Sequence, residues 1–221
     1  MAGGVRQRLR DARAQRAADR FHVWFYRNKR QTWENMQWFG VPLWKCPFDL
    51  WVYQEILHEC RPDVIVETGT AHGGSALYLA NLCDLIGNGR VVTIDVDVRP
   101  NRPTHPRITY LEGSSVTPAS IKQIESVIGA TDKTMVILDS DHHAPHVAEE
   151  LRLYSRLVTE GQYLIVEDSN INGHPVHPNF GPGPYEAIAD FLAHSPAFVR
   201  DDAREKFRVS FNPRGYLRRT S

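Results

Sequence analysis

The sequence has few of the features that mark secreted, membrane or nucleic-acid-binding proteins. Its 221 residues include three cysteines, Cys46, Cys60 and Cys83, an odd number without paired spacing, which argues against a disulfide framework or a four-ligand zinc site. The longest apolar runs are strand-sized, far short of the roughly 20 residues of a membrane helix. Basic and acidic residues balance at 26 each, so no net charge attracts nucleic acid or an anionic membrane. We expect a cytoplasmic protein with a small-molecule partner, and no nucleic-acid or membrane partner.

The first 60 residues differ in character from the rest of the chain. Arg6 to Arg20 hold six arginines without an apolar core, which is typical of a solvated helix rather than a secretory signal, with a contact in a homodimer or a lid as alternatives. Residues 21–60 contain all five tryptophans, which indicates packing or, as the alternative, a wall that stacks a substrate. We assign 1–60 to an aromatic-rich helical extension, with Asp49 expected to cap a helix over 49–59.

Residues 61–221 alternate between apolar runs and amphipathic segments. This pattern predicts an α/β, Rossmann-like domain, with a largely parallel sheet and helices on both faces. The expected strands are 64–67, 90–95, 108–111, 134–139 and 163–167, and the expected helices are 74–85, 118–128 and 146–157. Four of the strands end in an acid: Glu67, Asp95, Asp139 and Glu167. The carboxyl ends of parallel strands meet at one crevice, so these acids should face one ligand site, over which the loop 170–184 is expected to fold as a lid.

A glycine-rich turn follows the first of these strands, over residues 67–75 (ETGTAHGGS). Its spacing is not that of a dinucleotide fingerprint and no Walker lysine follows, so it favours a different adenosyl ligand. Glu67 suits the ammonium group of a methionine moiety, and the helix start at Gly74 and Ser75 supplies backbone donors for a carboxylate. Asp95, 28 positions after Glu67, suits ribose hydroxyls.

A second turn, 113–115, is placed to contact an adenine ring, with a helix cap as the alternative. The expected cofactor-binding residues are Glu67, Gly69, His72, Gly73, Ser75, Asp95, Ser114 and Asp139.

Three carboxylates cluster at the ends of the fourth and fifth strands. Asp139, Glu167 and Asp168 would repel one another unless a cation lay between them, and oxygen ligands favour magnesium. Asp141 is an alternative to Asp139, and solvent-facing carboxylates that cap helices are the alternative to a metal site. Zinc on His142 and His146 is disfavoured because no third soft ligand is apparent.

Taken together, 64–75 (VIVETGTAHGGS), 139–142 (DSDH) and 166–168 (VED) resemble the cephalosporin hydroxylase-like, or rhamnosyl O-methyltransferase, family of S-adenosylmethionine-dependent methyltransferases. The resemblance covers about 38–195, and a more distant one links the same strand-end pattern to catechol O-methyltransferase. Within the family, the short chain with a complete acid set is similar to methylmannose polysaccharide 1-O-methyltransferases. The absence of a two-histidine, one-carboxylate triad argues against an iron oxygenase.

The resemblance implies a class I methyltransferase fold, S-adenosylmethionine and Mg²⁺ as cofactors, and methyl transfer to a saccharide hydroxyl, mannoside or rhamnosyl in type. It places the ion on Asp139, Glu167 and Asp168, and catalysis on Asp139 and on His142 as general base, because similar enzymes place their proton acceptor three residues after the first acid. His143 is the alternative base. Alternative functions are methyl transfer to a catechol-type or natural-product hydroxyl, and a non-catalytic scaffold that binds an adenosyl ligand.

Overall fold

A seven-stranded sheet organises the structure, a computed structural model that describes residues 2–221. The strand order is β5-β4-β3-β6-β7-β9-β8. The strands are β3 (Val64–Thr68), β4 (Arg90–Asp95), β5 (Ile108–Glu112), β6 (Thr134–Leu138), β7 (Tyr163–Val166), β8 (Phe198–Arg200) and β9 (Tyr216–Arg219). The first five run parallel, whereas β9 is antiparallel to both β7 and β8. The order reverses between β3 and β6, the position at which sheets of this kind bind ligands.

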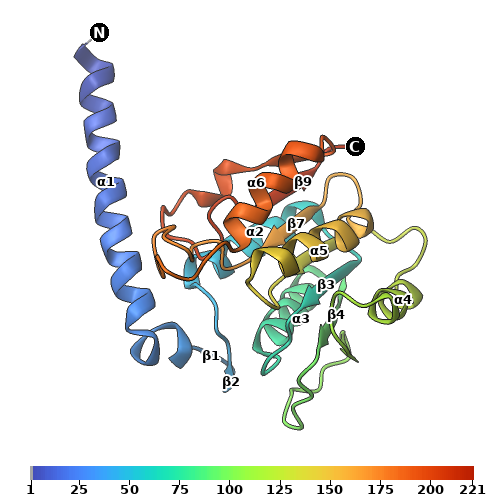
Figure 1. Ribbon diagram of the computed structural model, residues 1–221. Coiled ribbons are helices and arrows are strands. Elements are labelled where there is room, and N and C mark those ends of the chain that lie inside the picture. The colour runs from blue at the N-terminus through green and yellow to red at the C-terminus, as the bar shows by residue number, and fades with distance from the viewer. Residues whose placement is uncertain (1) are drawn as a thin grey trace.

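Helices cover both faces of the sheet, as the sequence predicts (Figure 1). α2 (Pro47–Cys60) and α3 (Gly74–Ile86) pack on one face, and α4 (Pro118–Val127), α5 (Ala144–Tyr154) and α6 (Pro184–His194) pack on the other. Alternate residues of β3 pack in the two cores. Ile65 lies in the first core, under α2 and α3, and Val64 and Val66 lie in the second core, under α4, α5 and α6. The division at residue 60 stays a prediction, although α2 packs into the first core.

Two helix starts differ from the prediction. Asp49 does not cap α2, because Cys46 occupies the N-cap and Pro47 begins the helix. The Asp49 side chain is instead buried and accepts hydrogen bonds from the backbone N of Phe211 (2.7 Å) and the hydroxyl of Tyr216 (2.8 Å). Burial raises the pKa of Asp49 to about 7 despite these hydrogen bonds.

α5 likewise begins at Ala144 rather than His146. Pro145 lies in its first turn, where the missing N–H of proline breaks no hydrogen bond within the helix.

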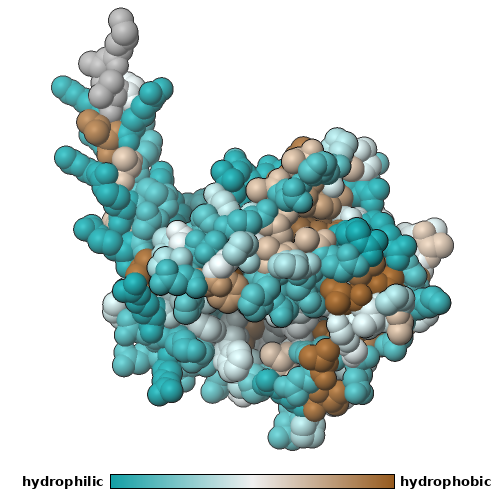
Figure 2. Space-filling model, viewed as in Figure 1, coloured by the Kyte–Doolittle hydropathy of each residue, from teal (hydrophilic) through white to brown (hydrophobic). Residues whose placement is uncertain are grey.

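The first turns of helix α1 (Ala2–Arg27) project from the body (Figure 1), and contacts with the body begin at Asp11, which pairs with Arg208 (3.2 Å). Its projecting part is hydrophilic (Figure 2), as expected for the arginine-rich segment. Its last turns pack on the body, where the rings of Phe25 and Tyr26 lie 6.2 and 5.3 Å from that of Phe211. Short 3₁₀ turns (Lys29–Gln31 and Trp33–Asn35) and a small hairpin, β1 (Gln37–Trp38) and β2 (Val41–Pro42), lead from α1 to α2. None of the helices in residues 2–221 is long and apolar enough to cross a membrane.

A buried histidine fastens α1 to the body. His22 is 3% exposed, and its Nε2 accepts a hydrogen bond from the side-chain amide of Asn170 (2.9 Å). Burial lowers the pKa of His22 from 6.5 to about 4, although the charge of Asp19 opposes this. The folded protein therefore holds this imidazole neutral.

We predict that the attachment of α1 weakens in mild acid. Between pH 6.5 and pH 4 the unfolded chain is protonated at His22 and the folded chain is not. The free energy of unfolding therefore decreases as the pH is lowered, by on the order of 3 kcal/mol across the whole window. His22→Gln, which keeps an acceptor and cannot titrate, should flatten the pH dependence of the unfolding free energy in this window. Urea unfolding of both proteins at several pH values measures the difference. Parallel pH profiles would show that His22 is not the group responsible.

Candidate active site

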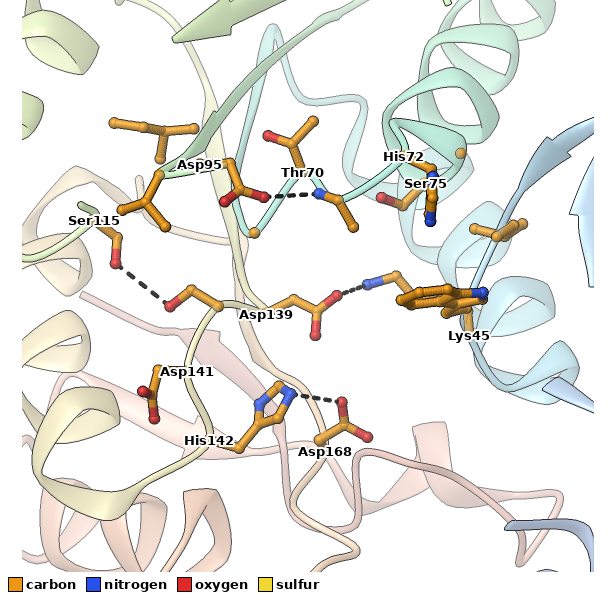
Figure 3. A pocket seen from close by; sticks show the side chains of 18 of the residues that line it. Lys45, Thr70, His72, Ser75, Asp95, Ser115, Asp139, Asp141, His142 and Asp168 are labelled. Atoms are coloured by element: carbon orange, nitrogen blue, oxygen red, sulfur yellow. Dashed lines mark hydrogen bonds and ion pairs between the residues drawn. The ribbon is translucent and has the colours of Figure 1, made fainter. Parts of the chain in front are cut away.

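A cavity of about 620 Å³ lies at the carboxyl ends of the parallel strands, where the order of the sheet reverses (Figure 3). Its walls contain most of the residues that the sequence predicts: Gly69, His72, Ser75, Asp95, Ser114, Asp139, His142 and Asp168. Three predicted residues, Glu67, Gly73 and Glu167, do not line it. The structure thus brings the cofactor turn and two of the three predicted metal ligands to one site.

The turn after β3 is held by a close backbone contact and by Asp95. Gly69 has a φ of +83°, and a Cβ atom there would lie 1.8 Å from the carbonyl oxygen of Asp139, so only glycine fits. The carboxylate of Asp95 accepts hydrogen bonds from the backbone N of Ala71 (2.8 Å) and of Asp97 (2.9 Å). The acid that is predicted to bind ribose therefore also shapes the cofactor turn (Figure 3).

Glu67 lies fully buried at the end of β3. Its Oε2 accepts a hydrogen bond from Thr93 (2.8 Å), whereas Oε1 has no partner among the described residues. Burial raises the pKa of Glu67, and the charge of Lys45 opposes the shift. A buried carboxylate oxygen without a partner fits a donor that the chain itself does not supply, such as an ammonium group.

Asp139, His142 and Asp168 form the one group of the described chain whose side chains are placed to hold a metal ion. Each offers a ligand atom, and these atoms lie within 4.8 Å of one another. His142 Nε2 is 3.2 Å from Asp168 Oδ2 (Figure 3). Asp168 has a φ of +53°, a left-handed conformation that is costly for a residue with a side chain and that often occurs at functional sites. Two carboxylates and an imidazole suit a divalent cation.

The carboxylates change the proton affinity of His142. Burial alone would lower its pKa, but the charges of Asp168 and Asp139 raise it above the ordinary value. The pKa of Asp139 is itself raised, because burial outweighs the nearby charge of Lys45.

Glu167, the third predicted metal ligand, lies beside the group Asp139, His142 and Asp168, and its assignment to the ion stays a prediction. Its Oε1 accepts hydrogen bonds from Lys45 Nζ (2.5 Å) and from the hydroxyl of Tyr53 (2.7 Å), both of them buried. Lys45 Nζ also donates to Asp139 Oδ2 (Figure 3).

Sequence reasoning missed Lys45, because a single lysine before a helix forms no motif. The sequence did contain one signal that could have pointed to it: several acids at the strand ends lie close together, and buried carboxylates need a cationic partner such as a lysine.

The alternative residues of the sequence analysis do not belong to the metal group, although Asp141 and His146 line the cavity. Asp141 accepts hydrogen bonds from the backbone N (2.8 Å) and Nδ1 (2.7 Å) of His143 and does not face Asp168. The side chain of His143 is 66% exposed and packs on Phe180. His146 contacts Ser115 and Ser140, each at 3.1 Å. These positions favour Asp139 over Asp141 and His142 over His143.

Aromatic side chains, and not the loop 170–184, form the outer wall of the cavity. Trp33 and Trp44 line it, and Trp44 meets His72 edge-on with ring centres 4.9 Å apart. No residue of 170–184 lines the cavity, so the expected lid is not seen. Buried Asn170, Ile171 and Val176 fix this loop against the body instead.

Solved structures share this fold, an O-methyltransferase among them. A cmcI chain with Mg-SAM is 25% identical to this chain with a TM-score of 0.64, covering 85% of this chain and 78% of the other. An O-methyltransferase from Bacillus cereus in complex with SAH, 19% identical, shares the fold with a TM-score of 0.52 over 71% and 73% of the two chains. Fold and site define an S-adenosylmethionine-dependent O-methyltransferase.

The family follows from sequence comparison. Residues 30–220 match the family model described as Rhamnosyl O-methyltransferase/CmcI, and the chain belongs to this family. A rhamnosyl O-methyltransferase of Mycobacterium tuberculosis is 42% identical over 209 residues, or 90% of this chain and 84% of the relative. The one from Mycobacterium leprae is 41% identical over 206 residues, or 90% and 89%. The resemblance seen in the sequence motifs is confirmed.

We predict that Asp95→Ala weakens S-adenosylmethionine binding by at least about tenfold, because a carboxylate that accepts two ribose hydrogen bonds contributes a few kcal/mol. Titration calorimetry measures the affinity. Glu112→Ala is the matched control, since Glu112 is the register partner of Asp95 on β5 and points to solvent. Equal affinities for wild type and Asp95→Ala would remove Asp95 from the cofactor site.

Proposed function

We propose that this protein transfers the methyl group of S-adenosylmethionine to a hydroxyl of a saccharide, rhamnosyl or mannoside in type, with the help of Mg²⁺. The observation that supports this most directly is the group Asp139, His142 and Asp168, which shares one cavity with the glycine-rich turn. A metal site and an adenosyl site side by side suit methyl transfer to oxygen. The names of the curated relatives, rhamnosyl O-methyltransferases matched over 90% of this chain, support a sugar acceptor.

The cofactor would lie along the ends of β3 and β4. Asp95 accepts the ribose hydroxyls, the unpaired Oε1 of Glu67 accepts from the ammonium group, and Ser114 contacts the adenine. Gly69, His72, Gly73 and Ser75 supply the rest of the binding turn. When bound, S-adenosylmethionine supplies an activated methyl group on a sulfonium centre.

The ion would be held by Asp139 and Asp168, whose carboxylate oxygens are ligands that magnesium prefers. Glu167 would join them through Oε2, because Lys45 and Tyr53 contact only its Oε1. When bound, Mg²⁺ lowers the pKa of a ligated hydroxyl, which makes the oxygen a better nucleophile.

His142 would remove the acceptor proton. In the neutral imidazole, the N–H on Nε2 would face Asp168 Oδ2, 3.2 Å away, so Nδ1 would accept the proton and Asp168 would stabilise the imidazolium that forms. Because the histidine must be neutral to act, activity should fall on the acid side of its pKa. Trp33 and Trp44 would provide the flat apolar surface on which a sugar ring packs.

We predict that the purified protein methylates methyl rhamnoside or methyl mannoside from labelled S-adenosylmethionine, that excess EDTA abolishes the transfer and that Mg²⁺ restores it. Asp168→Asn should behave like the chelated wild type, because the ion loses a charged ligand. Asp190→Asn is the control, since Asp190 is exposed on α6, lies outside the cavity and the metal group, and its substitution should leave turnover unchanged. Full activity in excess EDTA would exclude the ion. Transfer to a catechol but to neither sugar would overturn the acceptor class.

For His142→Ala we predict that kcat falls by about a hundredfold to ten-thousandfold, the usual scale of general base catalysis, with S-adenosylmethionine affinity nearly unchanged. The variant should also lose the acid limb of the pH profile. His143→Ala should retain most of the activity, because its side chain faces solvent. A raised KM with unchanged kcat would mean that His142 only holds the acceptor.

A further inference from the structure

A network of polar side chains lies in the cavity wall next to Ser114. Ser115, Ser140 and His146 all line the cavity, and they come from the turn after β5, the turn after β6 and the first turn of α5. His146 Nε2 lies 3.1 Å from the hydroxyl oxygen of each serine. The hydroxyl of Ser140 also lies 2.7 Å from Oε1 of Glu150, whose side chain is 1% exposed. In Figure 3, Ser115 lies on the other side of the cavity from Lys45.

These contacts fix which nitrogen of His146 carries the proton of the neutral imidazole. A carboxylate only accepts, so Ser140 donates its single proton to Glu150. The Ser140 oxygen then accepts from His146, which places the imidazole proton on Nε2. Nδ1 of His146 has no partner among the described residues and is not one of the buried polar atoms. In this tautomer Nδ1 carries a lone pair that can accept a hydrogen bond from a ligand.

Ser115 supplies a donor next to this acceptor. Its oxygen lies beside the same Nε2–H of His146, so its own proton points elsewhere. Among the described residues, the acceptor within reach of that proton is Ser140 Oγ at 3.4 Å, which is long for a bond between hydroxyl groups. The cavity wall therefore presents an acceptor and a donor side by side. Adenine presents the complementary pair, an exocyclic amino group that donates next to a ring nitrogen that accepts.

We propose that His146 is a specificity-determining residue for the methyl donor. Its Nδ1 accepts a hydrogen bond from the exocyclic amino group of adenine, and Ser115 donates to the neighbouring ring nitrogen. Ser140 and Glu150 are positioning residues, because they hold His146 in the tautomer that can accept. This inference rests on the proposed function, in which the adenine of S-adenosylmethionine lies beside Ser114.

The network makes the recognition of the base depend on pH. The hydrogen bond with Glu150 raises the pKa of His146, burial opposes the shift and the charge of Asp141 adds to it. The phenol of Tyr154 donates to the backbone oxygen of Ser115 (2.8 Å), and burial raises its pKa, so it stays protonated. Below the pKa of His146, Nδ1 carries a proton and no longer accepts from an amino group. Adenosyl binding should weaken as the pH falls through this pKa, whereas a base with an oxygen in place of the amino group should gain.

The test compares S-adenosylhomocysteine with S-inosylhomocysteine, in which an oxo group that accepts replaces the amino group that donates. Titration calorimetry on the full-length protein in EDTA measures both affinities without an ion or an acceptor. At pH 8.5 wild type should bind the adenosyl compound at least about tenfold more tightly, because mismatched hydrogen-bonding groups are left unpaired.

At pH 6 the ratio of the two affinities should be at least about threefold smaller, because His146 becomes protonated. His142 also titrates in the cavity, but its charge acts alike on both compounds and cancels in the ratio. A ratio near one at pH 8.5, or the same ratio at both pH values, would overturn the proposal.

Replacement of the histidine should remove the discrimination. His146→Ala should bind the adenosyl compound at least about tenfold less tightly at pH 8.5 and the inosyl compound within about threefold of wild type, with a ratio that no longer depends on pH. His194→Ala is the control, because it removes an exposed imidazole of α6 outside the cavity, and it should bind both compounds as wild type does. Discrimination of wild-type size in folded His146→Ala would contradict the role of His146.

A conservative variant keeps the test decisive if His146→Ala does not fold. Glu150→Gln preserves the shape of the side chain, but its amide can donate to Ser140, so the tautomer of His146 is no longer fixed. The ratio at pH 8.5 should then fall at least about threefold, and an unchanged ratio would exclude the positioning role of Glu150.

Failure of the cofactor site itself has a separate signature. If wild type binds neither compound, the proposed cofactor site is wrong, and the role of His146 falls with it. If wild type binds both compounds equally well, the cofactor site stands and the recognition of adenine by His146 is wrong.

Discussion

Repulsion between carboxylates is the constraint on which the rest of this structure depends. β3, β6 and β7 lie side by side and run parallel, so their carboxyl ends bring Glu67, Asp139, Glu167 and Asp168 together in a largely buried space. Each acid has its own partner: Thr93 for Glu67, Lys45 for Asp139 and Glu167, and His142 for Asp168. These three partners come from three different parts of the chain. Because Lys45 belongs to the segment before α2, the packing of this N-terminal segment on the sheet depends on the charges of Asp139 and Glu167.

The sequence predicted the parallel part of the fold well, because each of these strands is a short apolar run next to an amphipathic helix. It did not predict β8 and β9. β8 exposes two of its three residues, and both strands depend on antiparallel pairing with distant partners, which leaves no periodic signal in the sequence. The strand-end acids were found because the direction of parallel strands fixes where they meet.

What the sequence could not show is which way each side chain turns at the end of its strand. Glu167 and Asp168 are neighbours, yet the first points toward Lys45 and Tyr53 and the second toward His142. The left-handed backbone at Asp168 separates them, and no local pattern announces such a conformation in a residue other than glycine. Asp49 shows the same limit: at a helix start it resembles a cap, but contacts with Phe211 and Tyr216, more than 160 positions away, take its carboxylate into the core.

The backbone contact at Gly69 connects the glycine-rich turn after β3 with the residue that follows β6, Asp139. The turn after β3 rests directly on the carbonyl group that follows β6, without an intervening side chain, and a Cβ atom would have no room. Backbone that touches backbone leaves no soft side chain to absorb a displacement. In the proposed reaction, the turn that would hold the methyl donor and Asp139 beside the acceptor would thus be rigidly coupled, and adjustment to acceptors of different size would come from Trp33 and Trp44.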